Sequence, residues 1–254
     1  MVELTEYMDA AQVVLYAFWA FFAILLFYLQ QENRREGYPV ESDDNGYYDS
    51  DTFFYMPPAK TFKLPHGHGE VSVPNDNRDT RPIKGERPNH WLGSALVPTG
   101  DPLYDAIGPG SYAERADRPD LNAHGDPVIR PLSKAKGFSI EERDPDPRGM
   151  TVTAADGNSA GTVKDVWIDT AELMIRYLEV EVEDGKNVLL PMGFAALRKA
   201  KGDFYVHALL SDQMKNVPGI AKKDQITLLE EEKICAFYGG GQLYATWERS
   251  EPII

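Results

Sequence analysis

The sequence is poor in cysteine and in basic residues, and both shortages exclude classes of function. Its one cysteine, Cys235, can form neither an internal disulfide nor a multi-thiolate metal site, so nothing requires an oxidising compartment. The 26 Lys and Arg residues are outnumbered by 40 Asp and Glu residues, and the formal net charge of -14 disfavours a nucleic-acid-binding surface. No partner of this chain is therefore expected to be a nucleic acid.

Motifs for conventional catalysis are also missing from the sequence. It contains no nucleophile elbow, P-loop, dinucleotide fingerprint or metalloprotease motif. The glycines at 239–241 lack the preceding strand and the spacing of a phosphate-binding loop. We therefore predict that the chain is not an enzyme and has no catalytic residues.

Long apolar runs are rare too, but one is present near the start. Residues 10–29 read AAQVVLYAFWAFFAILLFYL and include no charged residue. About 20 helical residues span the ~30 Å hydrocarbon core of a bilayer. Because the run is apolar all round, it fits a transmembrane helix better than a core helix with one apolar face. We predict a single membrane span, which serves as an anchor.

The charges on either side of this run predict its orientation. Glu3, Glu6 and Asp9 precede it, whereas Arg34 and Arg35 follow it closely. The positive-inside rule then puts the N-terminus outside and the rest of the chain in the cytoplasm, with both arginines near anionic lipid headgroups. A cleaved secretory signal is the alternative, but the basic segment that starts such signals is absent.

Residues 37–148 are rich in proline and hold 15 of the chain's 18 prolines. Proline at this density prevents long helices and removes hydrogen-bond donors from strands. The segment could be a solvated linker or an extended chain draped over partner subunits. Apolar fragments such as 62–64 and 96–97 favour draping, because a solvated linker would lack them.

A short hairpin is predicted inside this segment, with strands at 61–64 and 70–73. The turn between them contains His66 and His68. Two histidines could indicate a metal site, but without further ligands nearby they are more typical of turn residues. No metal site is predicted.

Residues 149–254 have the pattern of a compact β domain followed by a helix. Asp156-Gly157 and Asp184-Gly185 are hairpin turn signals between alternating apolar runs. The predicted strands are 151–155, 161–168, 175–182, 187–191 and 204–208. We expect an antiparallel sheet that curls into a barrel, because a barrel has no exposed edges.

The C-terminal helix is predicted to run over residues 224–238, from an Asp cap to the stop at Gly239. The acidic triplet 230–232 is interpreted as a solvated face. Cys235 is interpreted as a buried or half-buried helix residue.

Two sets of titratable residues remain as candidates for moving protons. His124 and Asp126 form one set, and Asp169, Glu172 and Arg176 form the other. A histidine titrates near neutral pH, and an arginine can hold a nearby carboxylate in its charged form. Ordinary surface residues with one ion pair are the alternative, and the residues alone favour that alternative.

Five strings, in order along the chain, resemble the H subunit of purple-bacterial photosynthetic reaction centres. They are YLQQENRREGYP at 28–39, KTFKLPHGHGEVSVP at 60–74, PTGDPLYDAIGPGSYAERAD at 98–117, DVWIDTAELMIRYLEVEV at 165–182 and DQITLLEEEKICAFYGGGQLYA at 224–245. The resemblance covers nearly the whole chain. An unrelated membrane-anchored adaptor with the same β fold is the rival interpretation.

The resemblance implies a fold and a set of partners. One transmembrane helix (domain 1–36) and the extended segment (37–148) would precede a cytoplasmic PRC-barrel domain with a C-terminal helix (149–254). The domain would rest on the L and M subunits, which hold bacteriochlorophyll, bacteriopheophytin, quinones, carotenoid and the non-haem iron. This chain would ligate none of these cofactors. A cytochrome subunit and the light-harvesting antenna ring are further expected partners in the bacterial inner membrane.

The implied role is to stabilise the complex, shield its acceptor side from water and supply protons to the secondary quinone. His124 matches a histidine in the family's proton-uptake region, and Asp126 stands where some members have a second histidine. Asn122 replaces an acidic residue there, which argues against a tight metal site. Glu172 matches the inner glutamate near the quinone pocket. Asp169 and Arg176 match its acidic neighbour and its charge partner.

Overall fold

A computed structural model describes residues 3–5, 8–38, 40–41, 48–49, 56–75, 77, 79–89, 91 and 94–250. The chain divides into two compact units. The first comprises Met1–Thr80 and His90–Ser94, and the second Arg81–Asn89 and Ala95–Ile254. Each unit is described by itself.

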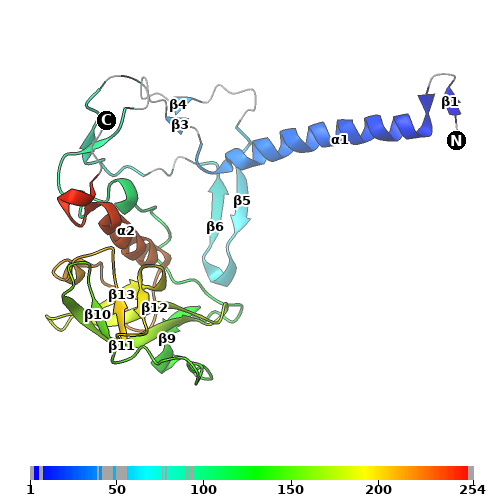
Figure 1. Cartoon of the computed structure of the whole chain (residues 1–254). Coiled ribbons are helices and arrows are strands. Elements are labelled where there is room, and N and C mark those ends of the chain that lie inside the picture. Colours follow the sequence, from blue (N-terminus) through cyan, green and yellow to red (C-terminus); the bar gives the residue numbers. More distant parts are fainter. Residues whose placement is uncertain are drawn as a thin grey trace. The chain divides into compact units, whose positions relative to one another are not determined.

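Helix α1, Ala10–Glu32, is the main element of the first unit (Figure 1). Asp9 caps its N-terminus, because the Asp9 carboxylate accepts the Gln12 N–H at 2.8 Å while the Gln12 side chain accepts the Asp9 N–H. No residue of α1 is buried. With the following turn it forms a 26-residue stretch that contains an 18-residue window of mean hydropathy 2.2, long and apolar enough to cross a membrane. The predicted span is confirmed in position and extends three residues beyond Leu29.

Short antiparallel strand pairs complete the first unit. Strands β5 (Lys60–Lys63) and β6 (Glu70–Val73) form the predicted hairpin, and β5 begins one residue earlier than expected. The pairs β1 (Glu3–Thr5) with β2 (Met8–Asp9) and β3 (Val40–Glu41) with β4 (Tyr48–Asp49) were not predicted.

A seven-stranded sheet forms the centre of the second unit (Figure 1). Its strands are β9 (Ile129–Pro131), β10 (Thr151–Thr153), β11 (Ser159–Asp169), β12 (Met174–Glu181), β13 (Asn187–Pro191), β14 (Ala196–Arg198) and β15 (Asp203–Tyr205). Their order is β13-β12-β11-β10-β15-β14, and β9 also pairs with β11. A separate pair joins β7 (Gly85–Glu86) and β8 (Val97–Pro98).

The predicted mainly antiparallel sheet is confirmed, with differences in detail. The hairpins β10–β11 and β12–β13 lie where their Asp-Gly turn signals put them. The pair β10–β15 is parallel, and β15 ends at Tyr205 rather than at residue 208. Strands β9 and β14 were missed because three residues are too few to show a period.

The core of the second unit lies between this sheet and helix α2, Leu228–Tyr244. Trp167, Leu178 and Leu190 are fully buried. Part of the proline-rich segment also packs into this core. The residues it contributes are Leu103, Val128, Ile129, Leu132 and Ala135.

The predicted ends of the C-terminal helix were wrong. Thr227 is the cap, and α2 continues through the three glycines to Tyr244. A Cβ atom at Gly241 would meet the Ala208 carbonyl oxygen at 2.4 Å, and one at Gly240 would meet the Gly110 Cα at 3.1 Å. The glycines therefore let other backbone segments approach the helix, and tertiary contact outweighs their tendency to end it.

Candidate functional site

The turn between β11 and β12 brings Asp169, Glu172 and Arg176 together. Asp169 is the last residue of β11 and is only 4% exposed. Its Oδ1 accepts the backbone N–H groups of Ala171 at 2.9 Å and Glu172 at 2.8 Å. Asp169 therefore shapes the turn, in the way Asp side chains do in Asx turns.

Arg176 bridges the two carboxylates. Its Nη2 donates to Glu172 Oε2 at 2.6 Å, and its Nε and Nη2 both donate to Asp169 Oδ2 at 3.2 Å. Burial lowers the pKa of Arg176, but the Asp169 hydrogen bond and the charges of Glu172 and Asp169 outweigh this, so the pKa is raised. We call these three residues the acid–arginine cluster. All three residues of the second predicted set are therefore in contact, with the positive charge of Arg176 between the two carboxylates.

His124 and Asp126 lie in a separate turn, residues 122–126. Asn122 Oδ1 accepts the backbone N–H groups of His124 at 2.8 Å and of Asp126 at 3.0 Å, and Leu121 bridges to Pro127 across the turn. Both His124 and Asp126 are exposed. The residue that departs from the acidic pattern, Asn122, therefore organises the backbone of this turn.

Strand β9 follows the 122–126 turn and pairs with the end of β11 that holds Asp169. Ile129 pairs with Asp169 between β9 and β11. The Val128 carbonyl oxygen accepts the Thr170 N–H at 3.0 Å and the Thr170 hydroxyl at 2.9 Å. The two predicted sets, more than 40 residues apart in sequence, therefore lie at the same end of one sheet.

Glu231 is a residue of this region that the sequence interpretation missed. The Tyr177 hydroxyl donates to Glu231 Oε2 at 2.8 Å, and Tyr177 is only 4% exposed. Glu230 is engaged as well, because its carboxylate accepts the Thr227 N–H at 2.8 Å in a capping box. The interpretation of residues 230–232 as a solvated face was therefore wrong. The helical period could have indicated this. Glu231 is three residues before buried Ile234, so both lie on the same face of the helix.

Comparison with known families identifies the chain. Residues 2–134 match the family described as photosynthetic reaction centre, H-chain N-terminal region. The chain belongs to this family. Residues 139–213 of this H chain match the PRC-barrel domain, which contains strands β10–β15 and the acid–arginine cluster. The predicted resemblance is confirmed, and with it the assignment to a photosynthetic reaction centre.

The family is one of structural subunits in a complex that binds cofactors, with L and M subunits as partners. Within the described part of this H chain, no group of three or more His, Cys, Asp or Glu side chains could hold a metal ion. His66 and His68 lie near each other in the β5–β6 turn, with ring centroids 6.4 Å apart. Cys235 is half-buried in α2, as predicted.

Arg34 and Arg35, which follow the apolar stretch of α1, make contacts within the first unit. Arg35 donates to the Glu32 carboxylate at 2.7 and 2.8 Å and to the Pro58 carbonyl oxygen at 2.8 Å. Arg34 is buried, with its guanidinium 5.3 Å from the ring centroid of Tyr38. These contacts fold the chain back at the end of the helix. Contact of the two arginines with lipid headgroups stays a prediction.

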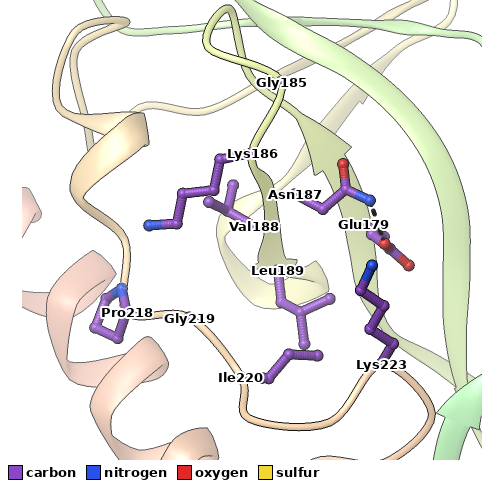
Figure 2. A pocket seen from close by; sticks show the side chains of 10 residues that line it. All are labelled: Glu179, Gly185, Lys186, Asn187, Val188, Leu189, Pro218, Gly219, Ile220 and Lys223. Atoms are coloured by element: carbon purple, nitrogen blue, oxygen red, sulfur yellow. Dashed lines mark hydrogen bonds between the residues drawn. The ribbon is translucent and has the colours of Figure 1, made fainter.

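A cavity of about 300 Å³ lies along β13, and Figure 2 shows its lining residues. Three of its polar side chains already have partners in the protein. Lys186 Nζ donates to the carbonyl oxygens of Lys215 at 2.9 Å and Val217 at 2.8 Å, and Glu179 accepts from Asn187 at 2.7 Å. None of the predicted site residues lines this cavity. It plays no part in the site.

Proposed function

We propose that this H chain caps the cytoplasmic face of the L and M subunits, stabilises their complex and carries protons towards the secondary quinone. One observation supports this most directly. The acid–arginine cluster lies at the same end of the sheet as the exposed 122–126 turn. A doubly reduced quinone in a dry pocket must take up protons, so a covering subunit needs linked titratable groups and water between them.

The two sets of residues have different tasks in this proposal. His124 and Asp126 are exposed and exchange protons with water. Glu172, with 58% of its side chain exposed, is the carboxylate that passes a proton on. Asp169 is buried and accepts four hydrogen bonds, so it positions Glu172 and Arg176.

The rest of the chain attaches this site to its complex. Residues 1–36 anchor the H chain in the bacterial inner membrane with the N-terminus in the periplasm, and Arg34 and Arg35 lie near lipid headgroups. Residues 37–148 drape over L and M, and 149–254 form the cap. The core positions of Leu103 and Ile129 support an ordered segment in place of a solvated linker.

The cofactors of the complex belong to its other chains in this proposal. L and M hold bacteriochlorophyll, bacteriopheophytin, carotenoid, quinones and the non-haem iron, and the H chain ligates none. A cytochrome subunit and the antenna ring are further partners. The first test is an absorption spectrum of the complex pulled down through this chain in mild detergent. Near-infrared bacteriochlorophyll bands in stoichiometric amount support the assembly, and a colourless pulldown from a pigmented membrane contradicts it.

Replacing Glu172 tests the proton path. Glu172→Gln keeps the size of the side chain but removes its titration. We expect the proton-coupled second electron transfer to the quinone to slow about 100-fold or more, because a positioned proton-transfer group contributes about 10²-fold or more. Initial charge separation should be unchanged.

Flash-induced absorption changes measure both steps across a pH series. Glu183→Gln is the matched control, because Glu183 is exposed in the β12–β13 turn, at the opposite end of β12. Second-transfer kinetics that stay at the wild-type rate at every pH would remove Glu172 from the path.

A further inference from the structure

Glu231 is held by a strand that also carries the acid–arginine cluster. Tyr177 directly follows Arg176 in β12, and its buried hydroxyl donates to Glu231 Oε2 at 2.8 Å. Glu231 itself is half-buried on α2. A carboxylate in this position is partly withdrawn from water and has a fixed hydrogen-bond donor.

The segment 115–120 carries two charged groups, Arg115 and Asp120, that act on the same carboxylate. It is fastened to the start of α2, since the Leu228 N–H donates to the Arg118 carbonyl oxygen at 3.0 Å and the Thr227 hydroxyl donates to Asp117 at 2.8 Å. Asp120 ends this segment, and its carbonyl oxygen accepts the Val128 N–H at 2.9 Å across the base of the 122–126 turn. The 115–120 segment therefore connects the start of α2, which carries Glu231, to the 122–126 turn.

The charged and titratable groups around Glu231 come from three elements. They are Arg176 and Tyr177 of β12, Arg115 and Asp120 of the 115–120 segment, and Cys235 of α2 itself. Burial raises the pKa of Glu231, while the Tyr177 hydrogen bond and the charges of Arg115 and Arg176 lower it only in part. The Glu231 charge in turn helps to raise the pKa of Arg176. The charge state of Glu231 is therefore coupled to the acid–arginine cluster.

We propose that Glu231 is a further proton-binding residue, which links the 122–126 turn to the acid–arginine cluster through Tyr177 and Asp120. Its carboxylate takes one proton from water and becomes a neutral carboxyl group, then releases the same proton towards Glu172 and returns to its charged form. Only O–H bonds form and break. The inference rests on the proposed function, because Glu172 is the residue that it supplies.

Three substitutions test the role of Glu231 in the intact complex. Glu231→Gln keeps an oxygen that can accept the Tyr177 O–H, so the fold is preserved while the titration is lost. We expect the second electron transfer to slow about threefold to tenfold, less than in Glu172→Gln, because a side link contributes less than the final donor. Glu232→Gln is the matched control, since the neighbouring Glu232 pairs with exposed Arg115 at 3.3 Å, and it should keep the wild-type rate.

Tyr177→Phe tests the direction in which the Tyr177 hydroxyl shifts the pKa of Glu231. The Tyr177 hydrogen bond lowers the pKa of Glu231, so its removal should move the Glu231 titration to higher pH. Infrared spectra of the full chain in detergent measure the carboxyl C=O band of Glu231 directly across a pH series. The band should be absent in Glu231→Gln. In Tyr177→Phe the midpoint of its titration should move to higher pH. An unmoved titration in Tyr177→Phe would show that the Tyr177 hydroxyl does not act on the Glu231 carboxylate.

The outcomes separate this inference from the proposed function. A wild-type rate in Glu231→Gln together with a slow Glu172→Gln would overturn the role of Glu231 and leave the proposed function standing. Wild-type rates in both variants would overturn the proposed function. A Glu231 band that titrates in the ordinary carboxyl range and ignores Tyr177→Phe would overturn the link even if the rates changed.

Discussion

The first unit exposes the large apolar side chains of its helix, whereas the second unit buries a core of them. Trp19 and Ile24 of α1 are exposed, and no residue of that helix is buried. Trp167 and Leu178 of the sheet are fully buried. Both units are rich in apolar residues, so apolar content alone does not distinguish them. The difference lies in what removes those side chains from water.

Helix α1 satisfies its backbone hydrogen bonds internally and leaves its side chains for lipid or partner helices. The PRC-barrel sheet buries most of its central strands in a core that α2, residues 206–226 and part of the proline-rich segment complete. The second unit should therefore resist unfolding through its own core, and the first should depend on its surroundings. Three predictions test this difference.

The largest effect is expected in the core of the second unit. Trp167→Ala removes a fully buried ring and should lower the free energy of unfolding by about 3–5 kcal/mol. Trp247→Ala is the matched control. Trp247 is 87% exposed, so its loss should change stability by less than about 0.5 kcal/mol. Urea unfolding of the full chain in detergent, followed by circular dichroism, measures both. Similar losses in the two variants would contradict a self-sufficient core.

A charge in the middle of α1 should affect the first unit alone. Ile24→Arg should cost about 2.5–3.5 kcal/mol of membrane insertion, since an arginine at the centre of a span is poorly solvated by lipid. Alkaline extraction of membranes measures the fraction of chain that stays inserted, with Ile24→Leu as the control. The urea midpoint of the sheet should stay at its wild-type value. Equal retention of both variants in the membrane would show that α1 does not act as an anchor.

The smallest effect concerns a half-buried ion pair at the edge of the sheet. Arg198 on β14 donates to Asp203 on β15, and Thr153 of β10 donates to the same carboxylate at 2.7 Å. The Arg198 hydrogen bond, then that of Thr153, lowers the Asp203 pKa from 3.8 to about 2. A lowered native pKa stabilises the fold above the unfolded value of 3.8, and this contribution is lost as pH falls through about 2.

Asp203→Asn should therefore flatten the fall in urea midpoint between about pH 4 and pH 2. The exposed Asp224 provides the control, and Asp224→Asn should keep the wild-type slope. Because the variant loses one ion pair and keeps its shape and its packing, the change should be far smaller than that of Trp167→Ala. Identical slopes in all three proteins would mean that the pair persists in the unfolded chain.

The features that the sequence predicted well depend on short-range patterns. The apolar run of α1 and the Asp-Gly turns of the hairpins each determine a structure over a few consecutive residues. The acid–arginine cluster was predicted because its three residues lie within eight positions, in one hairpin and its turn. The family resemblance, which the H-chain match confirms, rested on strings of sequence spread over the whole chain.

The features that sequence reasoning missed depend on contacts between distant residues. The end of α2 was wrong because Gly240 and Gly241 accommodate backbone from Gly110 and Ala208. Glu231 was taken for a solvent-facing residue because its partner, Tyr177, lies 54 positions away. A glycine or an acidic residue has the same local propensity whether or not such a partner exists.

The sequence by itself determined the apolar helix, the hairpins and the presence of two sets of titratable residues, because each follows from local periodicity, turn chemistry or charge. Only the tertiary structure decided that β9 carries the 122–126 turn to the end of β11, and that α2 brings Glu231 to Tyr177. Strand pairing and helix packing set the distances between residues far apart in sequence, and the electrostatic coupling between their charges depends on those distances.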